Sequence, residues 1–599
     1  MPLPLERVAG QAARAIETGL SFGLAAVLAL LLALVLVSVV LRYAFSTGVV
    51  GAEEAAIWLF GALVAAGLPL GLSGPLAMRL DALLRVLPGP WLVPSQLVAD
   101  AFTMIAGLSL LAGGTSAAGL IGSTSVALGL PDWLRPAGLA AGGGLLIALL
   151  FLKRVSEGRA IPVLLSSVLA ACAYACVQGF TIDLSWPPSL IALLIAGFGL
   201  ALGAPLAHCL LAGAFLVIPF GSGLPEGAIV STATSGLSRF LLLAIPFFLL
   251  AGGLLTTSGA AGHLVRLAAS LVGHRRGGLA QTALLTSVFF SGASGSSVAN
   301  AAFGATTFFP QLVQNGYRRE QAGAIVAATS VLDNVIPPSI AFLLLAAATD
   351  LSVGALLVGG IYAGLLMALC LAVAIHVANR HTAPAPAATN RERGQAFVSA
   401  IPALGLVLVV VTGIRLGVVT TTEAAALAAF YALLLVIAAG SRVRGMVWTF
   451  RQAASEAAAV GLLIGAAGPV TFLLAVDDVA TLVTTLVTAF GSHPLPVLLL
   501  CNLVLLGVGL VLDIGAAILL LGPILLPAAV AAGMDPVHFG VILVVNLMIG
   551  GLTPPVGILV FVVSGLTGIE AASLFKAVSP YLVALLAALS VLCLAALIL

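Results

Sequence analysis

The sequence reads VIPPS at residues 335–339 and LTPPVG at residues 552–557. Each stretch places two consecutive prolines inside a long apolar region, although proline lacks a backbone N–H and interrupts a helix. Such an interruption is costly in a membrane, because every backbone polar group there needs a partner within the protein. It is tolerated where it is buried in protein or lines a water-filled cavity, so both stretches are candidate binding positions.

The composition around these stretches is that of a membrane protein. Of the 599 residues, 61% are apolar and 7% are charged, and the mean hydropathy is +1.25. Apolar runs long enough to cross a hydrocarbon core about 30 Å thick recur along the chain, for example at 21–41, 356–375 and 581–599. These runs are continuous, unlike the alternating strands of a barrel. We therefore expect an all-α polytopic membrane protein with about 16 transmembrane helices.

Charged residues predict the orientation and exclude one class of function. The net charge is +2 and the basic residues are scattered, which excludes a nucleic-acid-binding surface. Basic clusters mark the expected cytoplasmic ends of spans, and they lie at 7–14, 153–159, 274–276, 380–393 and 442–451. The first apolar run is longer than the core of a signal peptide, so we expect a retained first helix and a cytoplasmic N-terminus.

Three regions follow from this pattern. Residues 1–155 are expected to form a small four-helix unit, with spans near 20–41, 55–73, 97–120 and 137–152. An even number of spans returns the chain to its starting side, as the basic clusters require. Residues 156–187 then form a connector with one extra transmembrane helix at 161–177, and residues 188–599 form a large unit.

The large unit contains a repeat. The polar linker HTAPAPAATNRERG at 381–394 divides it into halves of about 188–380 and 395–599. A shift of 217 residues aligns positions 310–338 with the second half without a gap, giving seven identities in 29 positions. Five of the seven are Gly or Pro, including both prolines of each pair. Repeats with interrupted helices at matching positions are typical of secondary transporters, whose binding site lies at the interruptions.

Polar residues cluster upstream of the first proline pair, in SGASGSSVAN at 291–300. The sequence Phe308-Phe309-Pro310 then predicts a turn that sends the segment back. We therefore expect a re-entrant hairpin whose tip carries Ser294, Ser296, Ser297 and Asn300. Small hydroxyl residues also allow close helix packing, and this alternative stays open.

The same shift places Asp513 opposite Ser296. A carboxylate in an apolar run is costly unless it faces a cavity or a cation, although a position at the membrane surface is also open. Backbone and hydroxyl oxygens near the proline pairs are ligands that a hard cation such as Na⁺ prefers. The half-helix after each pair begins with a positive end, which suits an anionic solute group.

Several motifs resemble those of one transporter family. They are SGASGSSVAN with VIPPS, AIPFFLLAGGLL (244–255), NGYRREQAGA (315–324), GVVTTTEAAA (417–426), GMDPVHFGV (533–541) and NLMIGGLTPPVG (546–557). Together they resemble the large (M) membrane subunit of tripartite ATP-independent periplasmic (TRAP) transporters. The first 150 residues resemble the small (Q) subunit, through LRYAF (41–45), GAEEAAIWLFGA (51–62) and MRLDALLRVLP (78–88), the last read as a helix lying along the membrane interface.

The resemblance implies a fused Q and M protein with the fold of inverted-repeat, elevator-type transporters, similar to the ion transporter superfamily, with two re-entrant hairpins. It implies Na⁺-coupled uptake of a small organic acid, which a periplasmic substrate-binding protein delivers. The expected location is the bacterial inner membrane, and the expected state is a monomer. Two or more Na⁺ ions and no organic cofactor are implied.

The resemblance also implies roles for individual residues. Sodium contacts fall on Ser294, Ser296, Ser297, Asn300, Val335, Pro337, Gly550, Thr553, Pro555 and Asp513. Solute contacts fall on Ser297, Asn300, Asn334, Ser339, Asn546, Pro554 and Gly557. The chain departs from the family at Asp333-Asn334, where Gly-Pro is common.

Three other functions were weighed. A stand-alone Na⁺/dicarboxylate symporter would need similar hairpins but not the first 150 residues. An intramembrane enzyme would need clustered catalytic groups, whereas the seven His residues are isolated from one another in the sequence. A proton pump would carry Lys, Glu or His through its helices. The sequence therefore favours a transporter that is not an enzyme.

Overall fold

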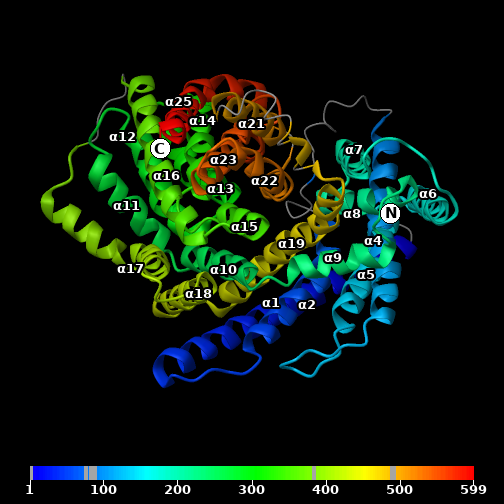
Figure 1. Cartoon of the computed structure of the whole chain (residues 1–599). Helices are drawn as coiled ribbons and strands as arrows, with labels where there is room; N and C mark the ends of the chain where they lie inside the picture. Colours follow the sequence, from blue (N-terminus) through cyan, green and yellow to red (C-terminus); the bar gives the residue numbers. More distant parts are fainter. Residues whose placement is uncertain are drawn as a thin grey trace. The chain divides into compact units, whose positions relative to one another are not determined.

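The computed structural model of the chain is helical throughout its described part (Figure 1). It describes residues 4–72, 79, 91–380, 386–479, 481–483, 485, 494–510 and 512–598, and the side chains of these residues except 4, 5 and 292–294. Twelve helices in this part are long and apolar enough to cross a membrane, and eight apolar helices of 10–17 residues accompany them. The prediction of an all-α polytopic membrane protein is confirmed.

The first region folds as expected from its apolar runs. Its helices are α1 Pro4–Phe45, α2 Ala52–Gly67 with the 3₁₀ turn η1 Leu68–Leu72, α4 Leu92–Leu120, α5 Leu134–Ser156 and α6 Ala160–Gly179. Each predicted span lies within one of these elements, including the connector span in α6. The helix expected at 78–88 lies outside the described residues, apart from Arg79.

The large region begins with many short helices. Those of its first half are α7 Pro188–Ala201, α8 Leu206–Leu216, α9 Glu226–Leu237, α10 Ala244–Thr257, α11 Ala260–Val272, α12 Gly278–Ser294, α13 Ser297–Gln314, α14 Arg319–Ser330, α15 Ile340–Thr349 and α16 Val353–Ala378. The 3₁₀ turns η4 Ile218–Phe220, η5 Phe240–Leu243 and η6 Val331–Asn334 lie between them.

The second half of the large region has its own set of helices. They are α17 Asn390–Arg415, α18 Thr421–Ala438, α19 Val443–Val476, α21 Pro494–Gly509, α22 Ile514–Ala531, α23 Pro536–Gly550, α24 Ile558–Thr567 and α25 Ala571–Ile598. The chain forms two compact units, residues 1–246 with 450–481 and residues 247–449 with 482–599.

The first unit is built around α4, which packs against α5, α6, α8 and α9 (Figure 1). Glycines allow these close contacts. A Cβ atom at Gly107 would lie 2.7 Å from the Ile147 side chain, and one at Gly113 would lie 2.6 Å from the Glu226 carbonyl oxygen. Small residues at helix contacts are how membrane helices approach each other without a hydrophobic driving force.

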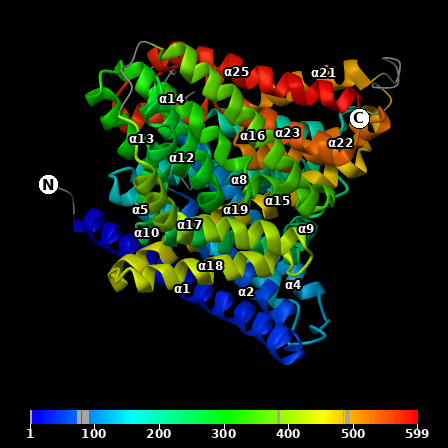
Figure 2. The same cartoon turned by 90° about the vertical axis from the view of Figure 1, so that its left-hand side faces the viewer.

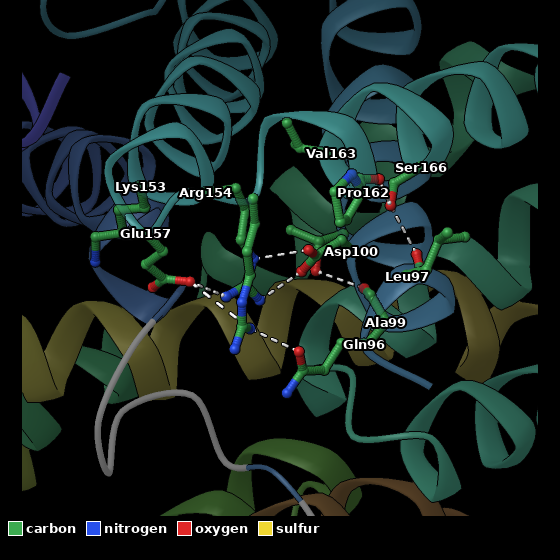
Figure 3. Close-up of polar contacts among 12 residues, drawn as sticks. Gln96, Leu97, Ala99, Asp100, Lys153, Arg154, Glu157, Pro162, Val163 and Ser166 are labelled. Atoms are coloured by element: carbon green, nitrogen blue, oxygen red, sulfur yellow. Dashed lines mark hydrogen bonds and ion pairs between the residues drawn. The ribbon is translucent and has the colours of Figure 1, made fainter. Parts of the chain in front are cut away.

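A charged cluster ties α4 to the end of α5 (Figure 3). Arg154 donates from Nε to Asp100 Oδ2 and from Nη2 to Asp100 Oδ1, both at 2.7 Å. The Asp100 side chain is 5% exposed and that of Arg154 is 15% exposed. Arg154 also donates to Glu157, and the connector helix joins the cluster where Ser166 Oγ donates to the Leu97 carbonyl.

The second unit shows the repeat in its helix boundaries. α13 and α22 begin 217 residues apart and end 217 residues apart, and α14 and α23 also begin at this separation. The two copies interlock, because α15 of the first packs on α22 of the second, and α24 of the second packs on α13 of the first. Figure 2 shows α16 beside α23 and α25, with which it also packs.

Candidate functional site

The first hairpin consists of α12 and α13, which meet at Gly295 and Ser296. Gly295 has a φ of 63°, a left-handed conformation that glycine adopts without strain. Ser296 is the N-cap of α13 and accepts a hydrogen bond from the Ala299 N–H at 3.4 Å. The rings of Phe290 and Phe303 stack at 4.8 Å between the two arms, which therefore run back along each other.

The predicted turn at Phe308-Phe309-Pro310 is wrong. These residues lie inside α13, which continues to Gln314. Glycine in the left-handed conformation reverses the chain sixteen positions earlier than this, since Gly295 ends α12. Ser297 and Asn300 fall in the first turn of α13 and are buried, as expected for the tip, whereas the Ser294 side chain is outside the described part.

The tip of the first hairpin touches the first proline pair. A Cβ atom at Gly295 would lie 3.2 Å from the Pro338 carbonyl oxygen. Helix α14 ends before η6, and α15 begins after the prolines with Ser339 as its N-cap. Ser339 Oγ accepts from the Phe342 N–H and donates to the Asn334 carbonyl. Hairpin and interruption thus meet, as the sequence predicts, and the half-helix begins where it was expected.

The carbonyl of Val335 lies against α16. A Cβ atom at Gly360 would lie 2.5 Å from the Val335 oxygen, so glycine is needed there. Val335 and Pro337 are buried, and so is Asp333 in η6. The 3₁₀ turn η6 also contacts α23 of the second repeat, which brings the two interrupted segments into the same part of the unit.

The second hairpin consists of α21 and α22. Asp513 is the N-cap of α22 and accepts a hydrogen bond from the Gly515 N–H at 2.9 Å. It is partly buried and holds the same capping position as Ser296 in the first hairpin. Each hairpin tip therefore presents the N-terminus of a helix, with its unbonded N–H groups and partial positive charge.

The second interruption follows α23, which ends at Gly550. A Cβ atom at Gly550 would lie 2.9 Å to 3.1 Å from the Gly509 backbone, so the end of α21 meets the end of α23 through two glycines. Thr553 Oγ1 donates to the Ile549 carbonyl at 2.8 Å. Gly557, before α24, is enclosed, since a Cβ atom there would lie 2.9 Å from the Leu552 carbonyl carbon.

The two proline pairs differ in exposure. Pro337 and Pro338 are buried, whereas Pro554 and Pro555 are exposed. The sequence does not predict this difference, because both pairs lie in equally apolar surroundings. Both pairs contain a cis peptide bond.

Several buried polar atoms around the hairpins lack a hydrogen-bond partner. They are Thr286 Oγ1, Ser297 Oγ, Asn300 Nδ2 and Asn546 Oδ1. Buried polar groups are normally paired, so such atoms call for an explanation. Among the described residues, no group of three or more His, Cys, Asp or Glu is placed to hold a metal. Hydroxyl, amide and backbone oxygens are therefore the candidate cation ligands.

Sequence reasoning missed Asn502 on α21. The side chain of Asn546 donates through Nδ2 to the backbone carbonyl of Asn502 at 3.2 Å and to its side-chain oxygen. Asn502 in turn donates to the Leu498 carbonyl at 2.7 Å. An amide inside the apolar run PLPVLLLCNLVLLGVG was the available signal.

Comparison with known proteins covers both parts of the chain. Residues 191–597 match the family described as "Tripartite ATP-independent periplasmic transporter, DctM component", and residues 31–160 match the corresponding DctQ component. The chain is 33% identical over 479 residues to the "Isethionate TRAP transporter permease protein DctMQ" of Oleidesulfovibrio alaskensis, covering 78% of this chain and 74% of that protein.

Two relatives match the large region. The "C4-dicarboxylate TRAP transporter large permease protein DctM" of Pseudomonas aeruginosa is 37% identical over 352 residues, which are 58% of this chain and 82% of that protein. The "Sialic acid TRAP transporter large permease protein SiaM" of Vibrio cholerae is 33% identical over 389 residues, which are 64% of this chain and 91% of that protein. The chain therefore belongs to the TRAP transporter permease family and joins its DctQ and DctM components in one polypeptide.

Proposed function

We propose that this protein is the membrane component of a Na⁺-coupled uptake system for a small organic acid, which a periplasmic substrate-binding protein delivers. The observation that carries the proposal is the set of buried, unpartnered polar atoms at the hairpins, Ser297 Oγ and Asn300 Nδ2 among them. These atoms lie where the tip of a hairpin meets an interrupted helix. Such meeting points hold substrate and coupling ions in secondary transporters.

Neutral oxygens are the proposed sodium ligands. Hydroxyl groups at Ser296, Ser297 and Thr553 and backbone carbonyls at Val335 and Gly550 offer the oxygen ligands that a hard cation accepts. Ser294, Asn300, Pro337, Pro555 and Asp513 complete the proposed set. Two ions or more are expected, one at each pairing of a hairpin with a proline pair.

The solute carboxylate is proposed to bind at helix N-termini. Helices α13 and α15 both begin at capped, buried positions, and their first N–H groups carry partial positive charge. Asn300, Asn334 and Ser339 add polar side chains near these two ends. Pro554 and Gly557 are proposed to approach the solute from the second repeat.

Transport is proposed to follow an elevator mechanism in the bacterial inner membrane, with the N-terminus in the cytoplasm. The second compact unit holds both hairpins and both proline pairs, which supports its movement as a body. The DctQ-like region belongs to the other unit, where it is proposed to enlarge a static scaffold. A monomer is the proposed state.

The experiment is uptake into proteoliposomes that contain the purified full-length protein. The solutes named for the relatives, C4-dicarboxylates, sialic acid and isethionate, form the starting panel, each with the solute-binding protein encoded beside the gene. Uptake is expected to require an inward Na⁺ gradient and the binding protein. Unchanged uptake with K⁺ in place of Na⁺ would refute the proposed coupling.

A stand-alone Na⁺/dicarboxylate symporter is the second candidate. The match of residues 31–160 to a DctQ component disfavours it, since such a symporter has no use for that region. Full uptake of the free solute without any binding protein would favour it.

A further inference from the structure

The orientation of the Asn546 amide is fixed by backbone carbonyls. A backbone carbonyl accepts hydrogen bonds and cannot donate them, so the Asn546 atom facing the Asn502 carbonyl must be nitrogen. The same reasoning fixes Asn502, whose nitrogen faces the Leu498 carbonyl. The Asn502 side-chain oxygen is therefore the atom that faces the second N–H of Asn546.

This arrangement uses both N–H groups of Asn546. One goes to the Asn502 backbone carbonyl and the other to the Asn502 side-chain oxygen. The remaining polar atom, Asn546 Oδ1, has no hydrogen-bond partner, and the residue is 0% exposed. Asn546 can therefore offer its surroundings an acceptor and no donor. A solute carboxylate, which also accepts, gains nothing by facing this atom.

The position of Asn546 in its helix selects the same kind of ligand. It lies in the last turn of α23, which ends at Gly550. The C-terminal end of a helix carries partial negative charge, which attracts a cation. Ser297 and Asn300 lie instead in the first turn of α13, at a positive helix end. The two asparagines thus occupy opposite electrical environments.

We infer that Asn546 is a sodium ligand through Oδ1 and that Asn502 positions it. The inference rests on the proposed Na⁺ coupling and changes the role of Asn546, for which the sequence resemblance implied a solute contact. Asn502 belongs to α21, the first arm of the second hairpin, so an ion held here would link that arm to the interrupted helix. Gly509 and Gly550 bring the same two helices together about one and a half turns away.

The test is a sodium titration of the purified full-length protein in detergent, without solute or binding protein. NaCl replaces KCl at constant total salt, and the melting temperature is recorded. A ligand that binds the native state raises stability as its concentration rises past its dissociation constant. For Asn546→Leu, the Na⁺ concentration at half effect is expected to rise about tenfold, and for Asn502→Ala by an intermediate factor.

Asn379→Leu is the matched control, since Asn379 is another buried amide of the second unit, with partners at Ile375 and Gln321. It is expected to lower the melting temperature in both salts and to leave the half-effect concentration of Na⁺ unchanged. If Asn546→Leu does not fold, Asn502→Ala carries the test, because it leaves Asn546 in place.

The outcomes separate the two proposals. A wild-type response to Na⁺ with an unaltered half-effect concentration in Asn546→Leu, or in Asn502→Ala where that variant alone folds, would overturn this inference alone. It would return Asn546 to a solute role, such as accepting from a solute hydroxyl. An absent response in the wild-type protein would overturn the Na⁺ coupling, and this inference with it.

Discussion

The buried ion pair between Asp100 and Arg154 allows a prediction whose direction depends on which partner is removed. Arg154→Met leaves a carboxylate that is 5% exposed without its two hydrogen bonds of 2.7 Å. Breaking a buried pair in this way costs about 3–5 kcal/mol, because the remaining charge is uncompensated. The variant is expected to be the least stable of the series.

Asp100→Leu is expected to cost less. The guanidinium then keeps its hydrogen bond to Glu157 at 2.8 Å, and Glu157 is 46% exposed, so the remaining charges stay partly hydrated. A loss of about 1–3 kcal/mol follows from the missing charged hydrogen bonds. The double variant leaves no buried charge at either position. It is expected to lie close to the wild-type protein, because apolar replacement of a whole buried pair is often neutral.

The assay is the temperature at which purified protein in detergent loses its monodisperse elution on size exclusion. The ranking of the variants is the readout, since a chain of this size does not unfold in one all-or-none step. Arg159→Met is the control, because Arg159 is 46% exposed although it donates to Gln96 at 2.6 Å. The reasoning fails if Asp100→Leu is as damaging as Arg154→Met, or if the double variant shows the sum of both losses.

Three further substitutions test other contacts. Gly550→Ala places a methyl group 2.9 Å to 3.1 Å from the Gly509 backbone and is expected to lower the melting temperature and abolish Na⁺-dependent uptake, whereas Gly507→Ala on the same helix meets open space and is expected to do neither. Asp513→Ala removes the α22 cap, at about 1 kcal/mol. Asp513→Asn keeps the cap and the melting temperature but is expected to lose uptake, and normal uptake kinetics in it would show that the charge is not needed. Tyr174→Phe removes the hydroxyl that donates to the carboxylate on α9 at 2.9 Å and is expected to cost about 1 kcal/mol, measured by melting; an unchanged melting temperature would count against this contact.

The repeat could be predicted from the sequence because glycine and proline carry backbone geometry in their identity. The shift that aligns the proline pairs also separates the starts of α13 and α22, and their capping residues Ser296 and Asp513. Short polar residues before an apolar run are a local signal for a helix start, and no tertiary contact is needed to read it.

The turn of the first hairpin was misplaced for a related reason. Proline inside an apolar run was read as a break at Pro310, but α13 tolerates it near its end. The partnership of Asn502 with Asn546 could not be predicted, since 44 positions separate them and their meeting depends on how α21 packs on α23. The burial of one proline pair and the exposure of the other depend on packing in the same way.

The crossed packing of α15 on α22 and of α24 on α13 constrains the history of the fold. Each copy lends its half-helix to cover the inner arm of the other, so a single copy would leave apolar surface bare. An ancestor encoding one copy would have needed a second molecule of itself to complete its structure. Duplication and joining then turned an obligatory partnership between two chains into an internal one.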